Sequence, residues 1–256
     1  MNGKSVQVVC VAVGQRYPDL YVERLASMLR RYMPVPFQLT CLTDRPRPLD
    51  STIEQRTLLE RRLARPNMRP TTHKLALFDR NFLPFHEFLY LDTSLVIHKD
   101  MGPLLEFAFG SPADLVIRRD WTYDCYNSCV MRIRHSDAMQ DIYSAFVEGR
   151  EYPHRNSGDQ DFIHAAVRDY GHQERVDLLP EEMIASYHDC KRIARTNRAR
   201  AYKEIEEAIV VKFYGRQKMH LLVKPTYRAV KVMLRRPHFA FNDGVFWIRE
   251  LRQRWM

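Results

Sequence analysis

Glycine is scarce in this sequence, with only 9 glycines among 256 residues. Soluble proteins average roughly 7% glycine, so chemistry that depends on glycine-rich phosphate loops is disfavoured. Motif searches agree, because the sequence contains no G-x-G-x-x-G, no P-loop, no H-E-x-x-H and no G-x-S-x-G. The sequence therefore lacks the motifs of four common enzyme classes, the dinucleotide-dependent dehydrogenases, nucleoside triphosphatases, zinc proteases and serine hydrolases.

Long hydrophobic runs are also missing. The uncharged stretch from Ser5 to Gln15 holds 11 residues, whereas a membrane-spanning helix needs about 18 or more. It follows Lys4 and resembles a short signal sequence, but Tyr17-Pro18 follows it in place of a small-residue cleavage site. We interpret this stretch as a buried first strand and expect the chain not to span a membrane.

Cysteine usage does not indicate a secreted, disulfide-linked protein. The five cysteines are odd in number and scattered, and no N-x-Ser/Thr site is present. Cys125 and Cys129 lie four positions apart, but no second pair and no nearby histidine completes a zinc site. We expect buried, reduced thiols in the cytoplasm. The cysteines are Cys10, Cys41, Cys125, Cys129 and Cys190.

The formal net charge of +9 is concentrated at one end of the chain. Residues 212–256 hold eleven Lys and Arg against Asp243 and Glu250, an excess of nine, so the residues upstream are formally neutral. Aromatic and basic residues alternate through this end, a mixture typical of segments that bind the headgroups of an anionic membrane. Nucleic acid is a second ligand for such a mixture, and a helix over 222–236 that packs on the domain with a solvated basic face is a third interpretation.

Hydrophobic periodicity predicts a β-α-β arrangement at the start of the chain. Val6 to Val13 is a valine-rich run, as in a strand buried on both faces. Leu20, Val22, Leu25, Met28 and Leu29 then recur at helical spacing, and a second apolar run spans Phe37 to Leu42. Residues 45–69, rich in Pro and Arg, are predicted to form an exposed excursion with a short helical stretch near 53–63.

The rest of the chain continues this alternation. We predict a helix over 72–82, one strand over 88–98 interrupted at 92–94, and a short helix over 103–109. Further apolar runs cover 114–117 and 128–133, helices cover 136–148, 159–170 and 199–208, and a last strand covers 209–213. Alternating strands and helices predict one α/β domain with a mostly parallel sheet and helices on both faces. Polar residues at strand ends are where such sheets carry their chemistry.

The chain contains an ordered series of short polar motifs. In chain order they are Tyr17, Thr72-His73-Lys74-Leu75, Tyr90-Leu91-Asp92-Thr93-Ser94, Asp124-Cys125-Tyr126-Asn127-Ser128, Gly158-Asp159-Gln160-Asp161 and Val211-Lys212-Phe213-Tyr214-Gly215-Arg216-Gln217-Lys218. This series, over about residues 6–220, resembles the family 8 glycosyltransferases, which use nucleotide sugars, have the Rossmann-like type-A fold and include glycogenin and bacterial lipopolysaccharide galactosyltransferases.

The resemblance implies a role for each of these positions. Tyr17 would stack on the uracil and Lys74 would reach the nucleotide. Asp120, Asn127 and Ser128 would bind the donor sugar. Asp159, Gln160 and Asp161 would lie near the anomeric carbon as the catalytic candidates. Donor nucleotide and diphosphate would contact Tyr17, Lys74, Asp92, Ser94, Lys212 and Lys218.

Two departures from the family pattern affect its metal site. Where the family has D-x-D, this chain has Asp92-Thr93-Ser94, so a hydroxyl replaces the second carboxylate. Lys212 stands where the family has its ligating histidine, and a protonated lysine has no lone pair for a metal. We therefore predict no metal cofactor, with Asp92 the one ligand if Mn²⁺ or Mg²⁺ binds. Lys212 would replace the metal by neutralising the leaving diphosphate.

The resulting hypothesis is a glycosyltransferase that moves a sugar, with retention, from a UDP-sugar to a glycan or lipid-linked acceptor. The domain would span residues 1–221, and residues 222–256 would be a basic, aromatic extension that attaches to the inner face of the cytoplasmic membrane. Two alternatives remain. One is a catalytically inactive protein that keeps the fold, and the other is a basic nucleic-acid-binding protein, a partner that we do not favour.

Overall fold

The structure is a computed structural model that describes residues 5–15, 17–58, 63, 65, 68–153, 155, 157–214, 219, 234 and 251–256. The chain divides into two compact units. The first comprises Met1–Glu23, Val35–Thr93 and Leu105–Leu179, and the second comprises Arg24–Pro34, Ser94–Leu104 and Pro180–Met256. The predicted domain boundary between residues 221 and 222 lies outside the described residues.

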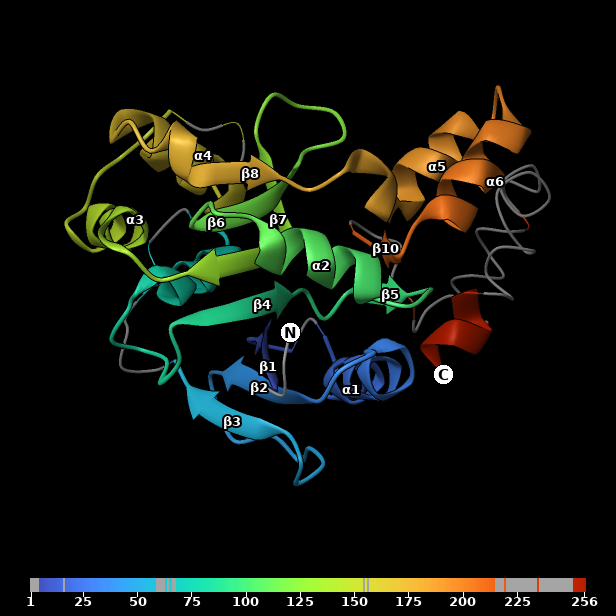
Figure 1. Cartoon of the computed structure of the whole chain (residues 1–256), viewed down its shortest axis with the longest axis horizontal. Coiled ribbons are helices and arrows are strands. Elements are labelled where there is room, and N and C mark those ends of the chain that lie inside the picture. The colour runs from blue at the N-terminus through green and yellow to red at the C-terminus, as the bar shows by residue number, and fades with distance from the viewer. Residues whose placement is uncertain are drawn as a thin grey trace. The chain divides into compact units, whose positions relative to one another are not determined.

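A seven-stranded sheet forms the centre of the first unit, with the strand order β3-β2-β1-β4-β7-β6-β8. Neighbouring strands are parallel except at β4–β7 and β6–β7, which confirms the prediction of a mostly parallel sheet. Figure 1 shows these strands side by side, with β3 at one edge. The strands are β1 (Val6–Ala12), β2 (Phe37–Thr43), β3 (Glu54–Thr57), β4 (Glu87–Leu91), β6 (Leu115–Arg119), β7 (Tyr126–Arg134) and β8 (Val176–Leu178).

The predicted first strands are confirmed because their apolar runs are buried at the middle of this sheet. In β1, Val8, Val9 and Cys10 have no exposed surface. Cys10 pairs in register with Cys41 of the parallel strand β2. Burial on both faces explains why this segment is a continuous apolar run rather than an alternating one.

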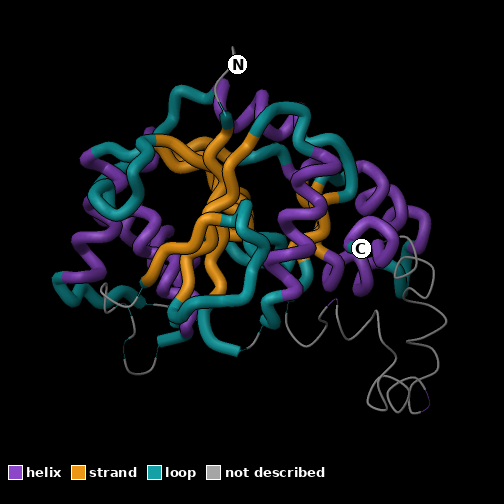
Figure 2. Tube along the Cα trace, turned by 90° about the horizontal axis from the view of Figure 1, so that it is seen from below, coloured by secondary structure: helices purple, strands orange, loops and turns teal. Residues whose placement is uncertain are grey.

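The core of the first unit lies where three helical segments pack together and against the sheet. These are the 3-10 helix η2 (Pro70–Phe78) and the helices α3 (Asp137–Val147) and α4 (Asp159–Asp169). Ser136 caps α3 by accepting a hydrogen bond from the Met139 amide. The orange sheet lies among purple helices in Figure 2. The helices predicted over 136–148 and 159–170 are confirmed.

A buried arginine ties β7 to the turn after α2 (Gly102–Gly110). Arg132 has no exposed surface, and its guanidinium donates to the carbonyls of Ala108, Ser111 and Ala113 at 2.7, 3.1 and 2.7 Å. Glu87 lies 3.7 Å from the same guanidinium. These bonds satisfy the carbonyl of Ala108 in the last turn of α2 and those of Ser111 and Ala113 just beyond its end.

The second unit contains a three-stranded sheet of order β5-β10-β9. Its strands are β5 (Leu95–Ile97), β9 (Ile184–Ser186) and β10 (Val210–Lys212). The helices α5 (Tyr187–Ile193) and α6 (Arg198–Glu207) pack on each other, as Figure 1 shows. The boundary between the units falls within α1 (Leu20–Tyr32) and within α2.

The described end of the basic segment packs within the second unit. Leu251 and Trp255 are each 1% exposed. The Arg24 guanidinium lies 5.7 Å from the centre of the Trp255 ring, and Arg31 donates to the Arg254 carbonyl at 2.5 Å. These two apolar side chains are therefore structural and do not face outward. Of residues 215–250, only Met219 and Leu234 are among the described residues.

Three element predictions are wrong. Residues 54–57 form the parallel edge strand β3 instead of a helix, because they extend the sheet beside β2. The excursion is not wholly exposed, since Arg47 and Ile53 are each 5% exposed. The apolar runs over 88–98 are two strands of different sheets. The helix predicted over 72–82 is present as a 3-10 helix over Pro70–Phe78, and β8, β9 and α5 were not predicted.

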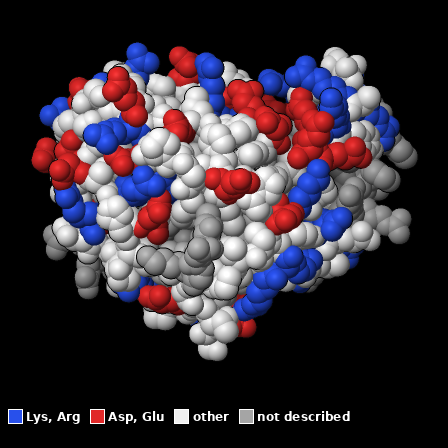
Figure 3. Space-filling view, in the orientation of Figure 1, with Lys and Arg blue, Asp and Glu red and all other residues white. Residues whose placement is uncertain are grey.

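Cysteine burial, helix hydrophobicity and surface charge complete the description of the fold. All five cysteines are free and buried. None of the described helices is both long and apolar enough to traverse a bilayer. On the face in Figure 3, acidic and basic side chains are interspersed over the described surface.

Candidate active site

The predicted donor-binding positions of the first unit gather at one end of its strands, the carboxyl ends of β1 and β4. These two strands are parallel neighbours. The loop after β1, which carries Tyr17, therefore leaves the sheet at the same edge as Asp92, which directly follows β4. β7 runs antiparallel to β4, so its beginning, with Asn127 and Ser128, lies at that edge too. The Asp92 amide donates to the Cys129 carbonyl at 2.9 Å. This edge is where open α/β sheets bind ligands.

Lys74 is the centre of a buried polar cluster. Its ammonium lies 2.9 Å from Asp92 Oδ1 and 3.4 Å from Asp159 Oδ2, and it donates to Ser128 Oγ at 3.1 Å. The Ser128 hydroxyl in turn donates to Asp159 Oδ2. Four residues from η2, β4, β7 and α4 therefore meet, all four of them predicted site residues.

Electrostatics keep Lys74 protonated in this cluster. Burial acts to lower the pKa of Lys74, but the carboxylates of Asp159 and Asp92 outweigh it and raise that pKa above 10.5. Two carboxylates share one ammonium here, so the cluster does not neutralise itself.

Tyr90 belongs to the cluster although its role was not predicted. Its hydroxyl donates to Asp92 Oδ1 at 2.6 Å, and the Lys74 ammonium lies 5.3 Å from the centre of its ring. Burial, with the Asp92 charge next, raises the pKa of Tyr90 well above 10. The phenol thus stays protonated and fixes the Asp92 carboxylate. The only sequence signal was a tyrosine two residues before an aspartate at the end of a strand.

The predicted sugar-binding residues Asp120 and Asn127 are paired. The Asn127 amide donates to Asp120 Oδ2 at 2.9 Å. Asp120 Oδ1 accepts from the backbone amides of Thr122 and Tyr123, which shapes the loop between β6 and β7. Asn127 is buried and adjoins Ser128, so this pair is joined to the Lys74 cluster.

The loop that carries Tyr17 is held by a second buried arginine. The Arg47 guanidinium, with a side chain 1% exposed, donates to the Gly14 carbonyl at 2.8 Å and to Asp19 at 2.5 Å. Gly14 has φ of 68°, a conformation that favours glycine. Tyr17 packs edge-on against Tyr21, with 5.1 Å between ring centres. Gly14 and Asp19 are therefore held by Arg47, from the loop after β2, and Tyr17 by Tyr21.

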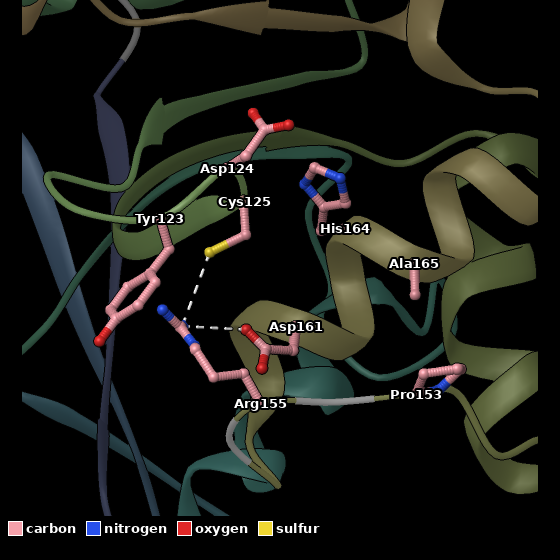
Figure 4. Close-up of a pocket in the computed structure, with 8 residues that line it drawn as sticks. All are labelled: Tyr123, Asp124, Cys125, Pro153, Arg155, Asp161, His164 and Ala165. Atoms are coloured by element: carbon pink, nitrogen blue, oxygen red, sulfur yellow. Dashed lines mark hydrogen bonds and ion pairs between the residues drawn. The ribbon is translucent and has the colours of Figure 1, made fainter.

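The first turn of α4 separates its two aspartates. Asp159 faces the Lys74 cluster, whereas Asp161 pairs with Arg155 at 3.2 Å. A pocket of about 220 Å³ lies on the Asp161 side (Figure 4). Gln160 is partly exposed between them. The pocket is lined by Tyr123, Asp124, Cys125, Pro153, Arg155, Asp161, His164 and Ala165.

Within the second unit, Lys212 contacts the position that replaces the second carboxylate of D-x-D. Its ammonium donates to Ser94 Oγ at 2.7 Å, and both residues are buried. The antiparallel pairing of β10 with β5 sets this contact, since Lys212 is opposite Leu95. Lys218, the other lysine predicted to bind the diphosphate, lies outside the described residues.

The residues at the family's metal positions do not fit a divalent ion. Lys212 has no lone pair, and Asp92 already bonds Lys74 and Tyr90. In the part of the chain that the structure describes, no group of three His, Cys, Asp or Glu side chains could hold a metal. Mg²⁺ and Mn²⁺ prefer several hard ligands in octahedral geometry.

Comparison with solved structures finds this architecture in several glycosyltransferases. GlyE of Streptococcus pneumoniae aligns with 98% of this chain and 63% of its own, at 12% identity and a TM-score of 0.60. The galactosyltransferase LgtC, solved with donor and acceptor sugar analogues, aligns with 97% of this chain and 100% of its own, at 13% identity and a TM-score of 0.56. The chain has the type-A glycosyltransferase fold.

A third structure in this fold is longer than the present chain. The bifunctional glycosyltransferase WbbM aligns with 98% of this chain at 11% identity and a TM-score of 0.58, and the chain spans 52% of its length. No family model and no curated protein matches the sequence. The likeness at these identities establishes the fold predicted from the sequence.

Proposed function

We propose that this protein is a glycosyltransferase that transfers a sugar from a UDP-sugar to a glycan or lipid-linked acceptor. The Lys74 cluster carries the proposal. Its ammonium, two carboxylates and hydroxyl come from four separate elements and converge at the sheet edge, in a chain whose fold is that of glycosyltransferases. Burying charged side chains costs desolvation free energy. We therefore attribute the Lys74 cluster to ligand binding.

In this proposal each part of the edge binds one part of the donor. Tyr17 stacks on the uracil, and Lys74 with Asp92 binds the nucleotide. Asp120 and Asn127 hold the sugar hydroxyl groups. Asp159, oriented by Ser128 and Lys74, stabilises the positive charge that develops at the anomeric carbon.

The proposed reaction retains the anomeric configuration by front-face transfer. The acceptor oxygen forms a bond to the anomeric carbon as the bond from that carbon to the diphosphate oxygen breaks. The proton of the acceptor hydroxyl passes to the departing diphosphate oxygen, so no protein base is required. Gln160 and Asp159 lie in the first turn of α4 and are the residues we assign to this step. NMR of the product anomer tests retention, which an inverted product would contradict.

We further propose that donor binding needs no metal. Lys212 would supply the positive charge that a metal supplies in the family, and Ser94 would orient its ammonium. A fixed ammonium can stabilise charge that develops on a leaving diphosphate. Lys218 would assist Lys212 in this proposal.

We propose peripheral membrane attachment through the basic segment 222–256. Support comes from its sequence, in which cationic and aromatic residues alternate. Leu251 and Trp255 would not take part, because both are buried within the second unit. Co-sedimentation with anionic vesicles, beside filter binding of DNA and RNA over a range of salt, tests this. Retention of nucleic acid without vesicle binding would favour the nucleic-acid-binding alternative.

The central experiment measures donor binding and turnover separately. Calorimetric titration with UDP, UDP-glucose and UDP-galactose should show binding, and a donor hydrolysis screen should show turnover. Asp159→Asn should keep UDP affinity but lower turnover on the order of 100-fold or more. Asp137→Asn is the matched control, since Asp137 is 92% exposed in the same unit.

The outcomes separate the alternatives. Absence of binding to UDP and to both UDP-sugars would overturn the proposal. Binding without hydrolysis or transfer of any donor would favour the inactive protein that keeps the fold. Equal losses in Asp159→Asn and Asp137→Asn would remove the role assigned to Asp159.

A further inference from the structure

The main chain of Arg47 is fixed by the edge strand β3. The Arg47 amide donates to Gln55 Oε1 at 2.9 Å, and Gln55 Nε2 donates back to the Arg47 carbonyl at 2.9 Å. Gln55 belongs to β3, which β2 separates from β1 (Figure 1). The main chain of Arg47 is therefore anchored to the outer strand of the sheet, two strands away from β1.

The Arg47 side chain reaches from there to the loop after β1. Its Nε donates to Thr43 Oγ1, at the end of β2, at 2.8 Å. One terminal nitrogen donates to Asp19 at 2.5 Å and the other donates to the Gly14 carbonyl at 2.8 Å. Each guanidinium nitrogen thus has an acceptor within the protein, and the side chain is 1% exposed. A ligand cannot reach Arg47, so any effect of this residue on a ligand passes through the residues that it holds.

Two of these residues, Gly14 and Asp19, lie on opposite sides of Tyr17 in the sequence. Gly14 precedes Tyr17 by three positions, and Asp19 follows it by two. Gly14 is held at both of its polar groups, because its amide donates to Asp44 Oδ2 at 3.0 Å and its carbonyl accepts from Arg47. Asp44 Oδ1 in turn lies 3.4 Å from the Arg47 guanidinium. One guanidinium therefore bonds the chain both before and after Tyr17.

The carboxylates around Arg47 are only partly buried. The side chains of Asp19 and Asp44 are 34% and 28% exposed. Burial acts to raise the pKa of Asp44, but the bond from the Gly14 amide and the charges of Arg45 and Arg47 outweigh it and hold that pKa below its usual value. Without Arg47 both carboxylates would still contact water, so a substitution there should change the geometry of the loop more than the stability of the fold.

We propose that Arg47 is a positioning residue for the nucleoside of the donor. The proposal rests on the proposed glycosyltransferase function, in which Tyr17 stacks on the uracil. A stacking ring contributes most when its place is fixed before the ligand binds. Arg47 fixes that place by bonding the chain on both sides of Tyr17 without touching the donor, and Tyr21 packs against the ring itself. The edge strand β3 thereby contributes to the site, because it anchors Arg47.

A double-mutant cycle on UDP binding tests whether Arg47 acts through Tyr17. Calorimetric titration gives the Kd for UDP of the unsubstituted protein, Tyr17→Ala, Arg47→Lys and the double variant. Loss of the stacking ring should raise the Kd roughly five- to 150-fold. Arg47→Lys keeps the charge but lacks the planar fork that spans two acceptors, so it should raise the Kd several-fold. In the Tyr17→Ala protein the same change should alter the Kd by less than about twofold.

Two further variants separate positioning from general damage to the fold. Asp19→Ala removes one of the two anchors at a partly exposed side chain, and its effect on the Kd should depend on Tyr17 in the same way. Arg56→Lys is the matched control, because Arg56 pairs with Glu54 at 2.8 Å on β3 and its side chain is 35% exposed. It should leave the Kd unchanged. Urea denaturation of every variant measures stability in parallel.

Each outcome supports or overturns the positioning role. Equal losses of UDP affinity with and without the Tyr17 ring would indicate a general structural effect and would overturn it, as would an unchanged Kd in Arg47→Lys or in Tyr17→Ala. If Arg47→Lys does not fold, Asp19→Ala decides between the same outcomes. All of these results leave the glycosyltransferase function in place. Absence of UDP binding in the unsubstituted protein would overturn that function, and the role of Arg47 with it.

Discussion

The Lys212 ammonium donates a hydrogen bond to Ser94 Oγ at 2.7 Å, which joins the two positions at which this chain departs from the metal-binding pattern of family 8. A lysine faces a hydroxyl where that pattern has a histidine and a carboxylate. If a lysine of the chain takes the place of a bound metal, both of these positions have to change together, as they do here.

Replacing Lys212 should therefore weaken donor binding. Lys212→Met removes a charged hydrogen-bond donor worth about 1.5–3 kcal/mol, so the Kd for UDP should rise roughly ten- to hundredfold. Calorimetric titration measures this. Lys203→Met is the control, because Lys203 is 73% exposed on α6. An unchanged Kd in Lys212→Met would remove Lys212 from the diphosphate site.

Chelation should have no effect on turnover. Because one carboxylate and an ammonium make a poor metal site, donor hydrolysis in excess EDTA should equal that in buffer, and added Mn²⁺ should not raise it. Initial rates with and without EDTA check this. Activity that EDTA abolishes and Mn²⁺ restores would show that a metal binds despite the altered positions.

Removal of Lys74 should reduce stability as well as activity. Lys74→Met leaves the buried Asp159 and the partly buried Asp92 without their cation, which should cost about 3–5 kcal/mol in the free energy of unfolding. Adding Asp159→Asn should recover part of that loss. Urea denaturation measures both variants, and the exposed Lys203→Met should change little. Equal stability of all these variants would contradict the central role of Lys74.

The pH dependence of this contribution follows from the raised pKa of Lys74. A group whose folded pKa is raised stabilises the protein fully below its unfolded pKa and loses that effect as the pH rises through the folded value. That value lies above 10.5, with burial opposing and Asp159 and Asp92 producing the increase. The difference in stability between the unsubstituted protein and Lys74→Met should therefore be constant between about pH 7 and 9.

A buried histidine should make the fold acid-sensitive. His135 is 6% exposed and its Nε2 bonds the Leu77 carbonyl at 3.0 Å, and burial lowers its pKa below 6.5. Below about pH 6.5 this histidine is protonated in the unfolded chain but still neutral in the folded chain. Protonation therefore stabilises the unfolded state, and the free energy of unfolding falls as the pH drops from 6.5 toward the folded pKa. His135→Gln should reduce this loss by up to about 1.4 kcal/mol per pH unit. Urea denaturation between pH 7.5 and 5.5 measures it, and parallel curves would contradict the assignment.

The last helical residues should contribute to the stability of the second unit. Trp255→Ala removes a side chain that is 1% exposed and packs near Arg24, a change that should cost about 3–5 kcal/mol. Trp255→Phe should cost less, because most of the buried area remains. Thermal denaturation measures both variants. Identical melting temperatures would show that this packing is not maintained in solution.

Continuous apolar patterns predicted the fold well. β1, β2, α3 and α4 follow their patterns because each buries several apolar residues, whereas the polar helix α6 buries only Ala201 and Ile205. In α1 the pattern was slightly misplaced, since Tyr21 is 1% exposed whereas Leu20 is 42% exposed. β3 was missed because an edge strand of four polar residues has no apolar pattern. The sequence did not show that β4 and β5 belong to different sheets. Only Asp92, Thr93 and Ser94 lie between these two strands, and the boundary between the units falls after Thr93.

The site was predictable where motif order specified it. Lys74, Asp92, Ser128 and Asp159 are in contact with one another, while Asp161, the third catalytic candidate, pairs with Arg155 on another side of the helix turn. Tyr90 stood in a quoted motif but was given no role, and Arg47 and Arg155 were missed because nothing in the sequence distinguishes a buried or paired arginine from an ordinary one. Their roles arise from contacts made across the fold, as Arg47 with Gly14 illustrates.

The bonds of Arg132 also bear on the order in which the first unit acquires its native structure. The carbonyls of Ala108, Ser111 and Ala113 find their donor 19 to 24 residues later in the chain. The turn after α2 therefore cannot be completed while β7 is still unpaired. Folding of this turn is therefore coupled to assembly of the sheet. Arg132→Lys lacks the planar fork of donors, so we expect it to refold more slowly.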